Sequence, residues 1–221
     1  MAINVITTVV EAASNYDLVA LADVKDDLAI TGTELDSFLK RAITRASVAA
    51  ANFCNRVFVA ETVQDAVMPD RDAFPYQVPG GMKKLQLSRW PVISITSVVE
   101  YTTTLVSGTD YTLDAKVGQL TRLDLSSTFP VEWSSLPVTA IYVAGYVTVP
   151  ADVQDAVTRM VKSRVDGRKR DPFLKVDEVA GVGRQEFWVA APGTAAAGKD
   201  VGDMPPDIAE MLERYRVPVV G

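Results

Sequence analysis

Apolar residues recur at helical spacing through the N-terminal third of the chain. Leu21, Val24 and Leu28 predict a short first helix. A longer stripe with a 3.6-residue period predicts a helix over residues 34–54; its apolar positions are Leu35, Phe38, Leu39, Ala42, Ile43, Ala46, Ala50 and Phe53. Thr33 followed by Asp36 is a capping-box-like start, in which the Thr hydroxyl accepts a backbone N–H of the first turn. Residues 1–17 lack this period, and we expect an arm.

After residue 56 the pattern changes to short β-branched and alternating runs. The predicted strands lie in residues 57–68, 83–87, 92–99, 111–114, 119–123 and 138–147. Lys116-Val117-Gly118 predicts a hairpin turn between two of these strands. Short strands separated by Gly and Pro indicate an antiparallel sandwich or small barrel. We expect its core and rim to contain Trp90, Trp133, Tyr101 and Tyr111.

The C-terminal third returns to helical periodicity and then becomes irregular. Pro150 suits the first position of a helix that ends near Gly167. Residues 171–189 are expected to be extended, with a strand over 186–189, and residues 190–204 form an Ala/Gly-rich linker. Pro205-Pro206 begins a short final helix whose apolar positions are Ile208, Met211, Leu212 and Tyr215.

These elements predict an α+β fold with a helical bundle core, an inserted antiparallel β domain and an extended C-terminal tail. The expected divisions are an N-terminal arm (1–17), the helical core (18–56 and 149–170), the β domain (57–148) and a C-terminal arm with a short terminal helix (171–221).

Composition narrows the chemistry. The 221 residues contain no histidine, which removes Ser–His and Cys–His nucleophile pairs and Cys/His zinc sites. The lone Cys54 ends an apolar helical stripe and is expected in the core. No apolar run approaches the roughly 18–20 residues that cross a bilayer, and the N-terminus lacks the basic segment of a signal peptide. We expect no catalytic residue, cofactor or metal site, although scattered carboxylates leave an enzyme of carboxylate chemistry as an alternative.

Charge is distributed unevenly along the chain. Residues 1–36 contain seven acids (Glu11, Asp17, Asp23, Asp26, Asp27, Glu34 and Asp36) and one base, Lys25. Residues 159–175 contain the bases Arg159, Lys162, Arg164, Arg168, Lys169, Arg170 and Lys175 against two acids. These segments form either two solvated faces or complementary surfaces that meet a neighbouring subunit or nucleic acid. The net charge of −6 argues against a free-standing DNA-binding protein.

Five short motifs, in this order, resemble the head-to-tail connector (adaptor) family of long-tailed bacteriophages and gene transfer agents. They are Leu21-x-x-Val24-Lys25-x-x-Leu28; an Ala-rich helix from Ala42 to Arg56; Trp90-Pro91-Val92; Tyr142-x-x-Gly145-Tyr146 leading to Val149-Pro150-x-x-Val153-x-x-Ala156; and Leu212-x-x-Tyr215-Arg216. The resemblance covers most of residues 18–216. Since the shortest members lack a large middle β region, this chain resembles a longer branch.

The resemblance implies a structural virion protein at the head–tail junction, assembled in the host bacterial cytoplasm. It implies a ring of about twelve copies docked on the portal protein, with double-stranded DNA passing through without sequence reading and a tail-side stopper or tail terminator bound below. Met211, Leu212, Tyr215 and Arg216 are then expected to bind the portal; Arg164, Arg168, Lys169 and Arg170 are expected to line the channel or contact a neighbour.

Other assignments stay open from the sequence. The tail could instead pack on its own domain. The chain could be a DNA-packaging or DNA-binding phage protein, or another tail-completion or minor tail component. A packaging protein predicts steeply salt-dependent affinity for duplex DNA through the segment from Arg164 to Arg170.

Overall fold

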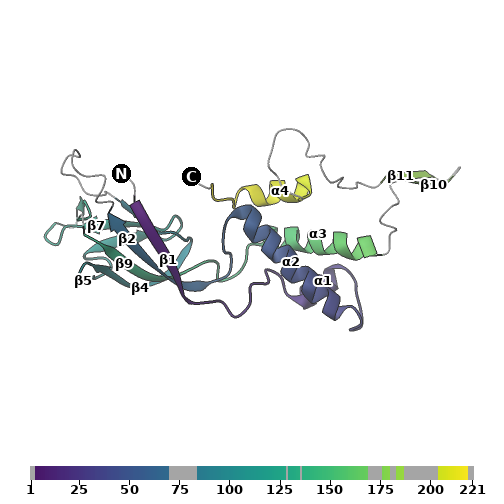
Figure 1. Cartoon of the computed structure of the whole chain (residues 1–221), viewed down its shortest axis with the longest axis horizontal. Helices are drawn as coiled ribbons and strands as arrows, with labels where there is room; N and C mark the ends of the chain where they lie inside the picture. Colours follow the sequence, from purple (N-terminus) through teal and green to yellow (C-terminus); the bar gives the residue numbers. More distant parts are fainter. Residues whose placement is uncertain are drawn as a thin grey trace. The chain divides into compact units, whose positions relative to one another are not determined.

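A computed structural model describes most of the chain (Figure 1). The described residues are 3–69, 84–127, 129–134, 136–168, 176–179, 183–186 and 204–218. The chain forms two compact units: Met1–Asn15 with Val57–Thr148, called here the β unit, and Tyr16–Arg56 with Val149–Gly221, called the helical unit. The predicted α+β class is confirmed.

The larger sheet of the β unit is antiparallel throughout. Its five strands are β1 (Ile3–Glu11), β2 (Glu61–Pro69), β9 (Val138–Ala144), β4 (Val92–Glu100) and β5 (Thr103–Leu105), in that order across the sheet. Central strand β9 alternates strictly between buried and partly exposed residues, as a strand with one face on a core must. Because β1 and β5 are edges, the described strands form an open sheet and not a barrel.

The smaller sheet contains the predicted hairpin. Its strands are β3 (Lys84–Gln86), β7 (Gln119–Leu123) and β6 (Tyr111–Asp114), and β8 (Pro130–Val131) pairs with β7. Gly118 in the β6–β7 turn has φ +66°, and a Cβ there would lie 3.1 Å from the Cβ of Trp90. Glycine therefore fits both the backbone conformation and the limited space.

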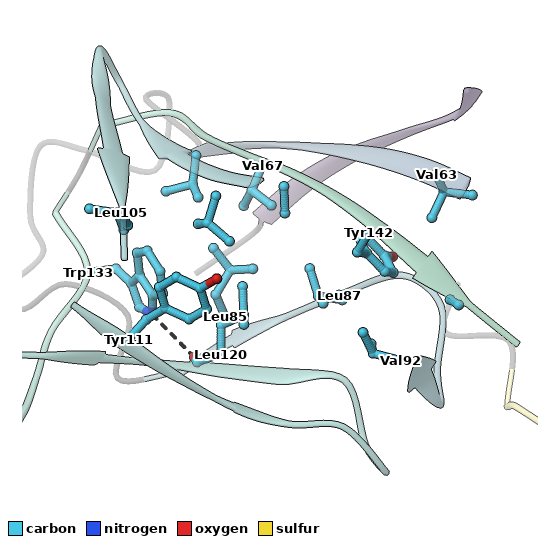
Figure 2. Packing of buried hydrophobic residues seen from close by; sticks show 14 residues of the cluster. Val63, Val67, Leu85, Leu87, Val92, Leu105, Tyr111, Leu120, Trp133 and Tyr142 are labelled. Carbon is cyan, nitrogen blue, oxygen red and sulfur yellow. Dashed lines mark hydrogen bonds between the residues drawn. The ribbon is translucent and has the colours of Figure 1, made fainter. Parts of the chain in front are cut away.

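One hydrophobic core joins the two sheets (Figure 2). Val67 of β2 and Tyr142 of β9 contribute from the larger sheet, and Leu120 of β7 contributes from the smaller one. Trp133 is 1% exposed, and its indole N–H donates to the carbonyl oxygen of Leu120 at 3.3 Å. Tyr111 is also buried, so both lie in the core as expected, whereas Tyr101 is 66% exposed.

The N-terminus differs from the expected arm. Residues 3–11 form β1, which pairs with β2 from Ile3↔Pro69 to Glu11↔Thr62. The β unit therefore takes its first strand from before the first helix and is not a simple insertion. The strand was missed because Ile, Val and Thr follow one another there without the alternation typical of a half-buried strand.

The helical unit contains α1 (Leu21–Asp27), α2 (Asp36–Cys54), α3 (Ala151–Arg168) and α4 (Pro206–Glu213). Helix α1 packs on α2 and α3, and α4 packs on the same two helices (Figure 1). Helix α2 ends at Asn55, whose left-handed φ of 47° is a common helix stop. No described helix is long and apolar enough to span a membrane.

One local expectation in this unit needs correction, and another falls mostly outside the described residues. The side chain of Thr33 does not cap α2; the N-cap residue is Leu35, and Thr33 contributes its backbone carbonyl to the N–H of Asp36. In the segment expected to be extended, β10 (Val176–Val179) pairs with β11 (Gly183–Glu186), and Glu186 is the only residue of the expected strand over 186–189 that the structure describes. Residues 187–189 lie outside the described part of the chain.

Candidate functional site

The terminal helix α4 is held on its own unit. Leu212 is 0% exposed and Ile208 is 2% exposed, and both lie on the face that packs on α2 and α3. The Cys54 thiol lies 3.6 Å from the carbonyl oxygen of Leu212, and the N–H of Val217 donates to the carbonyl oxygen of Cys54 at 2.9 Å. The arrangement is the alternative in which the tail packs on its own domain, and Leu212 is not accessible to a partner here.

The other residues expected to bind the portal retain exposed surface. Met211 and Tyr215 are partly exposed, and Arg216 is exposed. The Arg216 guanidinium lies 5.4 Å from the centre of the Phe53 ring, and the Tyr215 hydroxyl lies 3.4 Å from Asp152 Oδ2. These contacts fix the two side chains in place, so the outer side of α4 presents a preformed surface.

The predicted basic cluster is partly occupied by contacts within the unit. Arg164 Nη1 donates to the carbonyl oxygen of Ala42 at 3.2 Å, and the Arg168 guanidinium lies 4.4 Å above the Phe38 ring. Both arginines thus join α3 to α2. Lys169 and Arg170 lie outside the described residues.

A second set of bases, absent from the sequence prediction, lies on α2. Lys40, Arg41 and Arg45 are exposed, and within the described residues none of their side chains makes an ion pair or a hydrogen bond. They flank Val48, which is 49% exposed, on the side of α2 opposite the buried stripe. The signal for this set was present in the sequence. An apolar stripe at positions 39, 42, 43 and 46 places positions 40, 41, 45 and 48 on the solvent side of the same helix.

Helix α1 carries the opposite charge on its solvent side. Val24 is 0% exposed, and Asp23, Asp26 and Asp27 lie exposed on the other side of the helix. The single base of α1, Lys25, is turned inward and pairs with Asp36 at 2.8 Å. The acidic N-terminal segment thus becomes a purely acidic outer face on α1.

The β unit contains a buried carboxylate. Asp65 on β2 is 0% exposed and accepts hydrogen bonds from the Thr7 hydroxyl, the Ser88 N–H and hydroxyl, and the Tyr142 hydroxyl, at 2.7–2.8 Å. Burial raises the pKa of Tyr142, which keeps the phenol protonated as a donor. Four donors fill the acceptor capacity of a carboxylate, so Asp65 joins β1, β2 and β9 and has no lone pair left for a substrate.

Two other buried carboxylates in the β unit also make contacts that stabilise the fold. Buried Glu61 pairs with Arg89, and the carboxylate of Asp110 accepts the N–H of Val106 at 2.7 Å. Among the described residues, no group of three or more His, Cys, Asp or Glu is placed to hold a metal ion.

The β unit exposes several large apolar side chains outside its strands. Tyr101 is 66% exposed, and Leu125 and Phe129 are each 72% exposed. The N–H of Tyr101 donates to the carbonyl oxygen of Pro137, and its φ of 56° is rare for a bulky residue. Large exposed apolar side chains mark an interaction surface where they lie next to one another.

Gly145, which directly follows β9 and belongs to one of the five sequence motifs, is required there by the backbone geometry. Gly145 has φ +121°, and a Cβ there would lie 2.5 Å from the carbonyl oxygen of Val59. The N–H of Gly145 donates to the carbonyl oxygen of Pro91 at 2.9 Å. The segment Tyr142-x-x-Gly145-Tyr146 therefore has a glycine because two backbone segments converge there.

Comparisons with known proteins give a match in structure. No protein-family model and no curated protein sequence matches the chain. A chain in the structure of the "Neck of empty GTA particle computed with C6 symmetry" aligns over 100% of this chain and 98% of its own, with a TM-score of 0.51 and 18% identity. A chain in the structure of the "Virion of native gene transfer agent (GTA) particle" aligns over 97% of each chain, with a TM-score of 0.52 and 18% identity. The likeness shows that this chain shares their fold over nearly its full length.

Proposed function

We propose that this chain is a structural protein of the virion neck, a head-to-tail adaptor that joins the capsid to the tail. The observation that carries the proposal is the end-to-end likeness to a chain of a gene transfer agent neck, with 100% and 98% of the two chains aligned. A likeness that extends through both units indicates the same complete architecture, and not a common small domain found in many proteins. The order of the five sequence motifs supports the same assignment independently.

In this role the chain forms a ring under the portal, DNA passes through the ring, and a tail-side stopper or terminator binds the opposite side. The exposed outer side of α4, with Met211, Tyr215 and Arg216, is the proposed portal contact, and Leu212 supports it from beneath. Tyr and Arg are residue types that often dominate interface energy. Tyr101 and Phe129 of the β unit are exposed and are candidate residues for a second docking surface.

A DNA-packaging role is less well supported by the described residues. Arg164 and Arg168, the bases expected to contact DNA, are engaged with Ala42 and Phe38. A net charge of −6 also disfavours approach to a phosphate backbone.

Deletion of this protein from the producing cell distinguishes the adaptor role from the DNA-packaging role. Without a head-to-tail adaptor, we expect DNA-filled heads and separate tails by electron microscopy, with nuclease-protected DNA retained after the heads are stabilised by cross-linking. Empty heads would instead identify a packaging protein. Normal, infectious tailed particles would reject both roles.

The portal contact is tested with purified protein and portal rings. The variant Met211→Ala/Tyr215→Ala/Arg216→Ala should lose portal binding while the helical unit stays folded at the temperature of the binding assay, as circular dichroism checks. Glu210→Ala, on an exposed position of the same helix, is the matched control and should bind normally. Unchanged binding by the triple variant would remove α4 from the portal interface.

A further inference from the structure

The outer face of α2 is unusual for a solvated helix. Lys40, Arg41 and Arg45 give it three positive charges within two turns, and Arg41 and Arg45 stand one turn apart, where like charges repel. A surface helix normally offsets such bases with acids three or four residues away. Asp36 stands four residues before Lys40 but is already paired with Lys25 at 2.8 Å, and positions 37, 44, 48 and 49 are Ser, Thr, Val and Ala. The face thus lacks charge compensation from its own helix.

Helix α1 has the complementary property. Asp23, Asp26 and Asp27 are spaced three and four residues apart on its outer face, and Glu34 is exposed in the connection to α2. Within the described residues none of these acids forms an ion pair. Each copy therefore carries one uncompensated acidic face and one uncompensated basic face, with comparable numbers of charges.

The two faces cannot neutralise each other in one copy. Helices α1 and α2 pack through their inner sides, with Val24 of α1 and Leu39 of α2 fully buried. The charges lie on the opposite, solvent sides of both helices. Only a second molecule can bring an acidic face onto a basic one.

We propose that the basic face of α2 (Lys40, Arg41 and Arg45, around Val48) binds the acidic face of α1 (Asp23, Asp26 and Asp27) of a second copy of this chain. The proposal rests on the ring-forming part of the proposed function and assigns the residues of the contact between neighbours. Two different faces meet, so the contact is head to tail and leaves one free face at each end. Repetition of such a contact produces a ring where the rotation closes. The half-exposed Val48 supplies an apolar centre that ion pairs surround.

Charge complementarity favours a second copy over DNA as the occupant. Every copy brings the matching acids, whereas DNA would have to approach a chain with a net charge of −6, close to the acids of α1. Three bases neutralise only a few phosphates, which gives weak and strongly salt-dependent binding. DNA binding by this face is therefore the competing outcome of the tests below.

The first test uses the geometry of a head-to-tail contact. The variant Asp27→Cys/Arg41→Cys places one thiol on each face, and particles carrying it are treated with a short bis-maleimide. The native Cys54 is 0% exposed, and burial raises its pKa to about 11, so it stays unlabelled. A denaturing gel should show a ladder beyond the dimer, since each copy joins two neighbours. The single variants Asp27→Cys and Arg41→Cys should give no ladder.

Failure of the proposed contact and failure of the proposed adaptor function give different results. Monomers only, in particles that contain the chain at the neck, overturn the proposed contact and leave the adaptor role standing. Absence of the wild-type chain from purified particles overturns the adaptor role itself.

The second test reverses the charges. A base-reversed variant (Lys40→Glu/Arg41→Glu/Arg45→Glu) and an acid-reversed variant (Asp23→Lys/Asp26→Lys/Asp27→Lys) should each enter necks at least tenfold less than wild type. A chain with all six reversals restores attraction and should assemble again. The two triple variants expressed together should also assemble, because alternating copies satisfy every contact in an even-numbered ring.

Matched controls exclude misfolding and a general charge effect. Lys84→Glu/Lys116→Glu/Lys162→Glu changes the net charge by the same amount at three exposed positions outside α2 and should assemble normally. Failure of the six-fold reversal, although its helices melt like the wild type, overturns the proposal. So does a base-reversed variant that enters necks normally; if it also loses the wild-type protein's binding to a duplex DNA probe, the face binds DNA.

Discussion

Truncation of Leu212 tests whether α4 is part of the folded helical unit or a free docking arm. Leu212 is 0% exposed against the helices that α4 contacts. Leu212→Ala removes three buried carbon atoms, about 2.4 kcal/mol at roughly 0.8 kcal/mol per buried methylene. The cavity that remains raises the expected cost to about 3 kcal/mol, within the range of about 2–5 kcal/mol for such changes in cores. For a domain of this size, the melting temperature should fall by about 10 °C or more.

Far-ultraviolet circular dichroism at 222 nm is the suitable measurement, because the described helices all belong to the helical unit. Urea and thermal unfolding are recorded for the wild type, for Leu212→Ala and for Glu210→Ala. The exposed Glu210 should change the unfolding free energy by less than about 0.5 kcal/mol. Deletion of residues 204–221 should destabilise at least as much as Leu212→Ala, since it also removes buried Ile208.

A wild-type melting curve for Leu212→Ala would refute this reasoning. It would mean that α4 leaves its site in solution with little loss of free energy, as a docking arm does. The Ala/Gly-rich linker at residues 190–204 predicted a C-terminal arm of this kind. A large destabilisation with normal portal binding would instead show that α4 contributes to folding alone.

Three further predictions concern the interior. Asp65→Ala should destabilise the β unit by about 3 kcal/mol or more in urea unfolding, because the Tyr142 hydroxyl and its neighbouring donors lose their acceptor. Cys54 should react with a thiol reagent at pH 8 at least about 100-fold more slowly in the folded protein than in urea, because burial raises its pKa to about 11. Burial alone would raise the pKa of Glu100, but hydrogen bonds from Ser134 and Arg122 outweigh it and lower the pKa below 4.5. A lowered pKa stabilises the fold above the unfolded value, so the stability advantage of wild type over Glu100→Gln should be constant above about pH 5.5 and shrink as the pH falls below about 4.5.

Periodicity predicted the elements whose faces differ strongly in polarity. The stripe through Leu39, Ile43, Ala46 and Ala50 gave a helix over 34–54, and α2 spans Asp36–Cys54. The hairpin strands 111–114 and 119–123 agree with β6 and β7, because a glycine with positive φ marks the turn between them. The start of α2 was mispredicted at Thr33, since a capping box needs a side-chain geometry that spacing cannot specify.

Elements and sites that depend on contacts with residues far away in the sequence could not be predicted from local patterns. Strand β1 forms because β2, some 58 residues later in the register Thr7↔Asp65, offers a pairing edge and the buried Asp65 accepts the Thr7 hydroxyl. The position of α4 depends on its packing against α2 and α3, which its own apolar residues do not encode. The helical spacing of Lys40, Arg41 and Arg45 was sufficient to predict the basic face of α2. The prediction named bases of α3 instead, because residues 159–175 contain more bases.

The contrast between interior and surface indicates where function lies. Within the described residues, every buried side-chain nitrogen and oxygen has a hydrogen-bond partner, including the carboxylate of Asp65. On the outer faces of α1 and α2, by contrast, Asp26 and Arg41 stand among like charges that no described residue compensates. Water and salt tolerate such faces on a monomer, and selection for monomer stability alone would intermix the charges along each helix. Separation of the two signs onto two helices costs the monomer little, and in the proposed contact it brings opposite charges of two identical copies together.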